Sequence, residues 1–410
     1  MSFKIGIFGA IGVDDIGDVV MLESSLEKIK KAFDANNKKV IFYIFSLDQG
    51  KAKKQVSNID IDFKIVKTID FEGLNSEVLN ESFEDLKSNN LDYYKRIDNE
   101  FIDYFQKCDK IFFIGGGYFN KYWGNRLVPK FIIPLSLCYI LKKEYFVSGV
   151  TIGPFDDEQL KKYEGCFKNA RHIFLRDGDR SMDCLDQLGS SEGVIHYSGD
   201  DVLNRWFDQD VYDKEKKEPE VNSYAVLQLH HWAEMYSSNY VRLYKELASF
   251  LDIIIAQGNI EKVYFLPFDY FKGLDYECGR RLSTFFENRS EYVVLDPTSN
   301  HVFMRKIISG AKFVLASRYH PIVFSLGEGV PALGLYVNEL YEKKIGGAFQ
   351  SIGVSYEPHS LFIDNITSGE LYAWYEKYVR DEAFPDVNET KIKSYGQEWD
   401  KAVKNFLGLI

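Results

Sequence analysis

The sequence has few cysteines, and they follow no recognisable pattern. Among 410 residues there are 5 cysteines, at Cys108, Cys138, Cys166, Cys184 and Cys278, with no Cys-x-x-Cys pair. Scattered thiols in odd number are typical of a reducing compartment, and they exclude a disulfide scaffold and a cysteine-based metal site. Such crosslinks are not needed, because a chain of this length buries roughly three quarters of its unfolded surface.

Long apolar runs and an excess of positive charge are also missing. The most apolar stretch covers residues 131–140, is interrupted by Pro134, and is shorter than the ~20 residues of a membrane span. The first twelve residues carry one lysine and lead into acidic residues, which is unlike a signal peptide. The net charge of −11 has the wrong sign for a nucleic-acid partner. We therefore expect a cytoplasmic protein, and leave open a peripheral attachment to the inner face of the membrane.

Aromatic residues are abundant, with 32 Phe and 27 Tyr. The simplest interpretation is a core rich in aromatic rings, and the alternative is that some rings stack against sugars. A hydrophobic fraction of 45% is ordinary for a globular protein, and the length favours two domains over one.

Strand and helix patterns alternate along both halves of the chain. Residues 3–8 read as a buried strand, 18–36 as an amphipathic helix and 39–45 as a second strand, which is the opening of a parallel α/β sheet. Residues 51–107 are more polar and read as a short strand and one long helix, forming a lid or an insertion. The pattern predicts an α/β fold of two Rossmann-like, doubly wound domains that face a cleft. The expected divisions are residues 1–207 for the N-terminal domain, 208–222 for a charged linker, 223–385 for the C-terminal domain and 386–410 for a C-terminal helix that packs back across the domains.

Ligands of such sheets bind at the carboxyl ends of the strands, so the residues there are the candidates for a site. The first such turn, GAIGVDDIGD, departs from the Gly-x-Gly-x-x-Gly spacing of dinucleotide-binding proteins, which counts against an oxidoreductase. A later strand ends in a glycine triplet followed by tyrosine. We expect Gly116, Gly117 and Tyr118 to contact a substrate, with structural packing as the alternative.

Two arginines and two histidines also follow predicted strands. Arg176 is suited to bind an anion, or else to form a fixed ion pair at the start of a helix. Arg318 and His320 combine an anion clamp with a group that titrates near pH 7. His230 and His231 are adjacent, so in an extended chain their side chains point apart. We therefore expect His230 to contact substrate and expect no metal site.

Several of these segments together resemble the polysaccharide pyruvyl transferase family. The matching pieces keep their order over residues 5–353 and read GAIGVDDIGD, KIFFIGGGYF, VSGVTIGPF, ARHIFLRDGDRSMDCLDQLG, YSGDDVL, ASRYHPIVFSLGEGVPALGL and Tyr341-Glu-Lys-Lys344. The resemblance implies a glycosyltransferase-B-like fold and an enzyme of exopolysaccharide biosynthesis. Such an enzyme transfers the pyruvyl group of phosphoenolpyruvate to two hydroxyls of a sugar, which forms a ketal and releases phosphate. It implies catalytic roles for Arg318 and His320, and substrate contacts for Arg176, Asp15, Tyr341 and Lys344.

The residue types suit this chemistry. Phosphoenolpyruvate carries about three negative charges, from a carboxylate and a phosphate, which Arg176 and Arg318 would hold while His320 protonates the methylene carbon. The expected partners are this donor and a sugar or oligosaccharide acceptor, free or lipid-linked, and a homo-oligomer stays open. The scheme requires no metal and no cofactor beyond the donor. We expect His320→Ala and Arg318→Ala to lose turnover and keep the fold.

Two alternatives on the same fold remain. One is a glycosyltransferase that uses a nucleotide sugar, with Glu328 or Glu339 binding the ribose. The other is a glycan-binding relative without catalysis.

Overall fold

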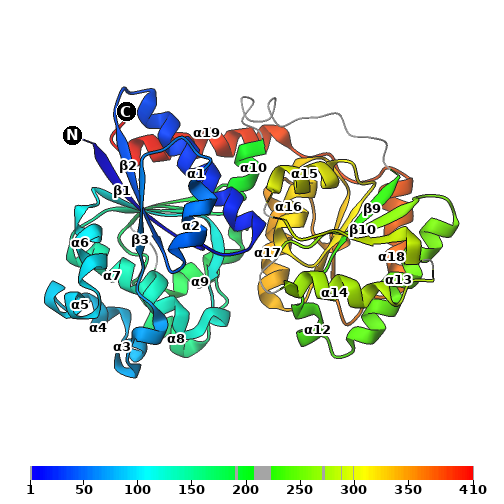
Figure 1. Cartoon of the computed structure of the whole chain (residues 1–410), viewed down its shortest axis with the longest axis horizontal. Coiled ribbons are helices and arrows are strands. Elements are labelled where there is room, and N and C mark those ends of the chain that lie inside the picture. Colours follow the sequence, from blue (N-terminus) through cyan, green and yellow to red (C-terminus); the bar gives the residue numbers. More distant parts are fainter. Residues whose placement is uncertain are drawn as a thin grey trace. The chain divides into compact units, whose positions relative to one another are not determined.

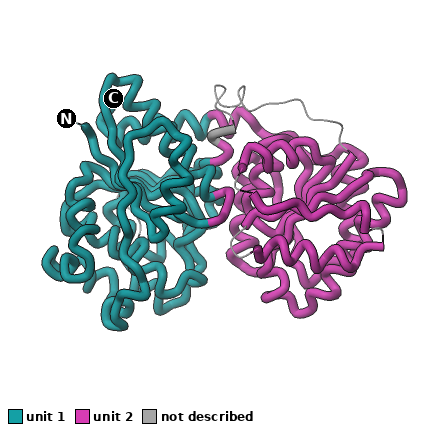
Figure 2. Tube along the Cα trace, in the orientation of Figure 1, with its two compact units in different colours: residues 1–13, 18–201, 394–410 teal, residues 14–17, 202–393 magenta. Residues whose placement is uncertain are grey.

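The computed structural model describes residues 2–189, 193–206, 223–269, 273–287, 289–298 and 300–409 (Figure 1). The chain divides into two compact units, coloured separately in Figure 2. Unit 1 comprises Met1–Val13, Asp18–Asp201 and Ser394–Ile410, and unit 2 comprises Asp14–Gly17 and Val202–Lys393. The predicted linker, residues 208–222, lies outside the described residues.

Unit 1 is built on a sheet in which the paired strands all run parallel. Because the first strand lies inside the sheet and later strands extend it on both sides, the unit is doubly wound. The order across the sheet is β3 (Phe63–Lys67), β2 (Val40–Ser46), β1 (Phe3–Phe8), β4 (Lys110–Phe113), β6 (Tyr145–Ile152), β7 (Ala170–Leu175) and β8 (Val194–Tyr197), and β5 (Gly116–Phe119) pairs with β6 off this path.

Side chains of this sheet alternate between two apolar layers, as the period of two in a strand requires. In β4, Ile111 and Phe113 belong to one layer and Phe112 belongs to the other. The Phe112 layer is covered by α1 (Ile16–Asp34), α2 (Gln49–Val56) and residues of α19 (Glu389–Phe406). These strands therefore read as continuous apolar runs, because both faces of the sheet are buried.

Residues 76–107 form four short helices, so the prediction of one long helix is wrong. They are α3 (Ser76–Asn80), α4 (Phe83–Ser88), α5 (Leu91–Ile97) and α6 (Asn99–Lys107). Asn75, Ser82, Asn90 and Asp98 each accept a hydrogen bond from a backbone N–H of the helix that follows, and such N-caps start a new helix wherever they occur. Apolar residues of α4 to α6 are fully buried in the Ile111 layer, so the segment is part of the core of unit 1.

The other helical segments of unit 1 include one wide turn. Pro134 has no N–H to donate to the carbonyl of Lys130, and the N–H of Ile133 bonds instead to the carbonyl of Val128, which produces a π-helical turn. The segments are η1 (Phe71–Gly73), η2 (Lys121–Arg126), the π turn η3 (Val128–Ile132), α7 (Ile133–Ile140), α8 (Asp157–Lys162), η4 (Gly178–Ser181) and α9 (Met182–Gln187), followed by α10 (Asp201–Trp206) at the unit boundary.

Unit 2 repeats the same design. Its parallel sheet has the order β11 (Tyr292–Val294), β10 (Lys262–Phe265), β9 (Tyr224–Gln228), β12 (Val314–Ala316), β13 (Ala332–Tyr336) and β14 (Ser360–Phe362). The helical segments are α12 (Trp232–Tyr236), α13 (Tyr240–Ala256), α14 (Leu274–Ser283), η6 (Arg289–Glu291), α15 (His301–Ser309), α16 (Tyr319–Gly327), α17 (Glu339–Ser351), η7 (Glu357–His359), α18 (Ser368–Tyr375) and η8 (Glu376–Arg380). The predicted fold class, with two Rossmann-like doubly wound units, is confirmed. Within the described part of the chain, no helix combines the length and the apolar composition that crossing a bilayer requires.

Candidate active site

The Arg-x-His segment forms the turn between β12 and α16 in unit 2. Arg318 is the N-cap residue of α16 in an extended conformation, and Pro321 occupies the first turn of the helix, where a missing N–H costs nothing. This local design places Arg318 and His320 at the carboxyl end of the sheet, as the sequence predicted. Both side chains are largely buried, with 8% of each exposed.

Arg318 is held by three carboxylates of unit 2. Its Nε donates to Oδ2 of Asp275 at 2.6 Å and its Nη2 to Oδ1 of Asp275 at 3.0 Å, which is a bidentate pair. Nη2 also donates to Asp269 at 2.9 Å, and Nη1 donates to Asp15 at 3.1 Å. Gln228 stabilises the pair of Arg318 and Asp275, because its side-chain amide donates a hydrogen bond to Asp275 and accepts one from the backbone N–H of Arg318. A guanidinium with these partners is a fixed centre of an ion-pair network, rather than a cation open to a ligand on every side.

The pKa values reflect this mutual stabilisation. Burial alone would raise the pKa of Asp15, but the hydrogen bond from His320 and the charge of Arg318 hold it below its usual value. Burial likewise opposes the ionised form of Asp275, yet the adjacent guanidinium keeps its pKa low. The pKa of Arg318 is raised above its ordinary value, because the charges of Asp275 and Asp15 outweigh its own desolvation. Asp15, Asp275 and Arg318 are therefore ionised at neutral pH.

Asp15 links this network to His320. Its Oδ1 lies 3.3 Å from Nδ1 of His320 and also accepts the backbone N–H of Gly17 at 2.9 Å. A carboxylate on Nδ1 orients the imidazole. It leaves Nε2, which is buried in this structure, as the ring nitrogen that does not face Asp15. A Cβ added to Gly17 would lie 1.8 Å from Nδ1 of His320, so only glycine leaves room for the ring.

Gly17→Ala should therefore lower turnover by about 100-fold or more, because displacement of a catalytic group by about 1 Å can cost that much. The matched control is Gly369→Ala. Gly369 is also the second residue of a helix in unit 2, and an added Cβ there meets open space. Turnover and thermal unfolding should be measured on both variants, and wild-type turnover in Gly17→Ala would show that the position of His320 does not matter.

His230, Tyr341 and Lys344 lie around the same network. The backbone N–H of His230 donates to Oγ of Ser317 at 2.6 Å, next to Arg318. The Tyr341 ring lies 5.8 Å from the His230 ring, and Nζ of Lys344 lies 4.9 Å above Tyr341. Burial, followed by the charge of Arg318, lowers the pKa of His230 well below its usual value. His230 is thus a neutral polar group at neutral pH, and Lys344 adds a second cation to the site.

Side-chain atoms of His230, His231 and Asp275 lie within 4.8 Å of one another, close enough to share a metal ion. Both oxygens of Asp275 already accept hydrogen bonds from Arg318. A divalent ion there would lie beside the guanidinium or displace it, and the charge of Arg318 would oppose its binding. That the site holds no metal stays a prediction.

Arg176 is buried in unit 1, where it pairs with other residues of the protein. Its side chain is 1% exposed and its Nη1 donates to Asp200 at 2.8 Å, while its Nε donates to Oγ1 of Thr151 at 3.1 Å. This contact favours the alternative of a fixed Arg–Asp ion pair, and substrate binding by Arg176 stays a prediction. The partner is Asp200, which follows β8, rather than the neighbouring Asp177.

Asp201 lies beside this ion pair and is fully enclosed. Its Oδ2 accepts a hydrogen bond from Ser148 at 2.7 Å, and Ser148 in turn accepts one from Nε1 of Trp399 at 2.8 Å. A Cβ on Gly115 or on Gly149 would come within 2.9 Å of the Asp201 carboxyl group. Gly115, just after β4, and Gly149, within β6, therefore make room for this side chain.

Burial, reinforced by the charge of Asp200, raises the pKa of Asp201 to about 7. The folded state thus holds a proton that the unfolded chain releases near pH 4, so the contribution of Asp201 to stability should fall as the pH rises from about 4 to about 7. At about 1.4 kcal/mol per pKa unit, the fall is at most roughly 4 kcal/mol. Chemical unfolding across this range should show a declining difference between wild type and Asp201→Asn, and parallel curves would contradict the assignment.

Gly116, Gly117 and Tyr118 lie in a strand of unit 1. They form strand β5 instead of an open turn, and the Tyr118 ring is 1% exposed and stacks on Phe131 at 4.1 Å. A Cβ on Gly116 would lie 2.6 Å from that ring. The glycine therefore serves packing, which is the alternative that the sequence left open, and a contact of Tyr118 with substrate stays a prediction.

Sequence reasoning missed Asp269, Asp275 and Gln228. Asp269 and Gln228 follow or end strands of unit 2, so the strand-end rule could have found them. Asp275 lies in the first turn of α14 and carries no signal that separates it from an ordinary helix-start carboxylate.

Two doubly wound α/β units, with polar residues at the strand ends, define the class of glycosyltransferase-B-type proteins. Similar solved structures support this class at the level of the fold. They include MnaA of S. aureus with UDP, at 12% identity, covering 100% of this chain and 98% of that one with a TM-score of 0.56. UDP-GlcNAc 2-epimerase from Neisseria meningitidis bound to UDP-GlcNAc is similar at 9% identity. The match covers 98% of this chain and 99% of that one, with a TM-score of 0.57. MurG of Acinetobacter baumannii is similar at 9% identity. The match covers 98% of this chain and 99% of that one, with a TM-score of 0.50.

The chain belongs to the polysaccharide pyruvyl transferase family, whose model matches residues 16–339. The matched region contains Arg318 and His320 and begins directly after Asp15. The resemblance noted from the sequence is confirmed.

Proposed function

We propose that this protein transfers the pyruvyl group of phosphoenolpyruvate to two hydroxyls of one sugar residue in a glycan or glycan precursor, forming a ketal and releasing phosphate. The main support is the contact between Asp15 and His320 beside Arg318, in a chain of the polysaccharide pyruvyl transferase family. A carboxylate-oriented imidazole is a suitable group for proton transfer near neutral pH.

In the proposed reaction, Nε2 of His320 gives a proton to C3 of phosphoenolpyruvate. C3 becomes a methyl group, the C2–C3 double bond becomes a single bond, and C2 becomes electrophilic. One sugar hydroxyl forms a bond to C2. The bond from C2 to the phosphate oxygen then breaks, and the second hydroxyl takes its place. Of the two hydroxyl protons, one restores the proton of His320 and the other leaves with phosphate. Asp15 stabilises the protonated imidazole and fixes its orientation.

The charges at the site refine the role of Arg318. One guanidinium among Asp15, Asp269 and Asp275 is more than neutralised, so it cannot by itself hold a trianionic donor. Lys344, above the Tyr319 and Tyr341 rings, is the second cation that we assign to the donor. Arg318 then organises the three carboxylates and orients His320 through Asp15.

The decisive experiment incubates the purified protein with phosphoenolpyruvate and a panel of galactose-, mannose- and glucose-containing acceptors, both free and lipid-linked. We expect phosphate release together with an acceptor that gains the mass of pyruvate less one water. The scheme requires no metal, so EDTA should not change the rate. Absence of product with every acceptor, together with binding of a nucleotide sugar in a thermal-shift screen, would overturn the proposal.

The alternative of a nucleotide-sugar glycosyltransferase loses one of its two candidate ribose ligands. Glu328 forms an ion pair with Arg305, and both side chains are largely buried. Glu328 is therefore committed within unit 2.

A further inference from the structure

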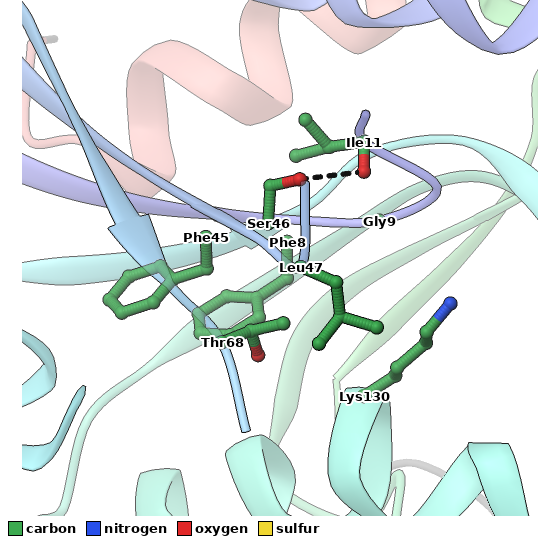
Figure 3. Close-up of a pocket in the computed structure, with 8 residues that line it drawn as sticks. All are labelled: Phe8, Gly9, Ile11, Phe45, Ser46, Leu47, Thr68 and Lys130. Carbon is green, nitrogen blue, oxygen red and sulfur yellow. Dashed lines mark hydrogen bonds between the residues drawn. The ribbon is translucent and has the colours of Figure 1, made fainter. Parts of the chain in front are cut away.

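Figure 3 shows a small hollow in unit 1 at the carboxyl ends of β1 and β2, lined by residues that include Phe8, Phe45 and Lys130. Its volume is about 20 Å³, which is room for little more than one water molecule. A substrate does not fit there. In unit 2, by contrast, His231 combines a partly exposed ring with a buried carboxylate beside it.

His231 is the N-cap residue of α12, and its backbone already has helical angles. Its ring therefore stacks on the ring of His230, with 4.3 Å between the centroids, instead of pointing away from it as in an extended chain. Nδ1 of His231 is enclosed, whereas 18% of the side chain is exposed. Because Nδ1 is the enclosed ring nitrogen, Nε2 is the one that a ligand can reach.

Asp275 faces the enclosed nitrogen of His231, with 3.8 Å between Oδ1 and Nδ1. Among the described residues, Oδ1 accepts one hydrogen bond, from Arg318, whereas Oδ2 accepts four. A carboxylate oxygen has two lone pairs, so Oδ1 can accept a second hydrogen bond, from His231. Such contacts are often long in the absence of substrate and shorten in the complex.

Arg318 therefore connects two pairs of a histidine and a carboxylate. Asp15 lies between Arg318 and His320, and Asp275 lies between Arg318 and His231. A carboxylate at Nδ1 orients an imidazole and stabilises its protonated form. Ketal formation needs two groups that exchange protons, since C3 of the donor gains a proton while a sugar hydroxyl loses one.

Lys344, the cation that we assign to the donor, also links the two histidine pairs. Its Nζ lies 5.5 Å above the ring of Tyr319, which is 5.1 Å from the ring of His320. The same Nζ lies 4.9 Å above the ring of Tyr341, which is 5.8 Å from the ring of His230. A donor bound at Lys344 would therefore have His320 at one end and the two stacked histidines at the other.

The aromatic rings next to His231 suit a sugar. Trp232 is partly buried, and its ring lies 6.4 Å from the ring of His231. The ring of Tyr236 lies 5.5 Å from that of Trp232, and Tyr236 is 42% exposed. Partly exposed aromatic rings give the C–H groups of a sugar an apolar surface to pack against, whereas a phosphate group gains nothing from them.

We propose that His231 is the base that takes the proton of the first acceptor hydroxyl, an inference that rests on the proposed function. The O–H bond breaks while the oxygen forms its bond to C2, and the proton moves to the lone pair of Nε2. When the bond from C2 to the phosphate oxygen breaks, Nε2 gives this proton to the departing phosphate and His231 returns to its neutral form. His320 exchanges the other two protons, those of C3 and of the second hydroxyl.

The test compares His231→Asn with wild type, using the acceptor that the panel identifies. Asparagine is favourable at a helix N-cap, so thermal unfolding should stay close to that of wild type. The value of kcat should fall by about 10²- to 10⁴-fold, and KM for phosphoenolpyruvate should not change, because Lys344 holds the donor. His301→Asn is the matched control, since His301 is also partly buried at the start of a helix and lies outside the site.

His231→Ala distinguishes a base from a residue that only supports the structure. Imidazole in solution should restore part of the turnover of this variant and should leave wild type and His301→Asn unchanged. An inactive wild-type protein would overturn the proposed function and this inference together. In an active protein, this inference alone is overturned if His231→Asn keeps more than a tenth of wild-type turnover, or if imidazole does not raise the turnover of His231→Ala.

Discussion

Replacing Arg318 with methionine should lower the free energy of unfolding by about 3–5 kcal/mol, as expected when one partner of a buried ion pair is removed. The reason is that Asp275, with no exposed side-chain surface, would lose both hydrogen bonds from the guanidinium. Its carboxyl group would then either stay charged without a partner, repelled by Asp15 and Asp269, or take up a proton, and both states are less stable than the ion pair. Chemical unfolding followed by circular dichroism measures this loss. The expectation from the sequence, that removing Arg318 abolishes turnover and leaves the fold intact, is revised accordingly.

The matched control is Arg281→Met. Arg281 makes the same two-pronged contact, with Glu234 at 2.7 and 2.6 Å, but its side chain is 47% exposed. Exposed pairs contribute about 0–1 kcal/mol, so this variant should be nearly as stable as wild type. The double variant Arg318→Met/Asp275→Leu should regain part of the loss, because it removes the stranded charge. Equal stability of the Arg318 and Arg281 variants would contradict the assigned network.

His320→Asn should reduce turnover by about 10²- to 10⁴-fold, the usual contribution of general acid–base catalysis. Asparagine can still donate a hydrogen bond to Asp15 from the position of Nδ1, but it has no group that exchanges a proton with the substrate. The stability of the variant should therefore stay close to that of wild type. Turnover is measured by phosphate release from phosphoenolpyruvate in the presence of an acceptor that the panel identifies.

His301→Asn is the control, since His301 lies at the start of α15, outside the site. The decline of the rate at alkaline pH that a general acid produces should be present in this control and absent from His320→Asn. A His320→Asn enzyme with more than a tenth of wild-type turnover, or with an unchanged pH profile, would remove His320 from the mechanism.

Local signals in the sequence predicted the fold well. Alternating apolar strands and amphipathic helices mark both units, because a parallel sheet with two covered faces demands that pattern. The Arg-x-His turn was predicted for the same reason, since it directly follows a buried strand. The prediction of one long helix within residues 51–107 failed because cap residues start a new helix at four places, although each of them was visible in the sequence: Asn75, Ser82, Asn90 and Asp98.

The partners of the predicted site residues could not be derived in this way. The carboxylates on Arg318 come from positions 15, 269 and 275, and their convergence depends on tertiary packing. In the sequence, Arg176 and Arg318 are equivalent, because both are arginines at strand ends. In the structure, Asp200 neutralises Arg176 in the core of unit 1, whereas Arg318 belongs to a network of ion pairs that includes His320. Burial and pairing distinguish the two, and neither property is encoded near the arginine itself.

The return of the C-terminal helix to the first unit has a consequence for biosynthesis. Trp399 and Phe406 pack on Phe112 and Phe146, so one face of the first sheet is covered by residues that the ribosome makes only after unit 2. During the whole synthesis of unit 2, this apolar face of the nascent N-terminal half therefore stays exposed to water. We therefore expect ribosome-bound intermediates to recruit chaperones, and a fragment that ends before residue 394 to aggregate rather than fold.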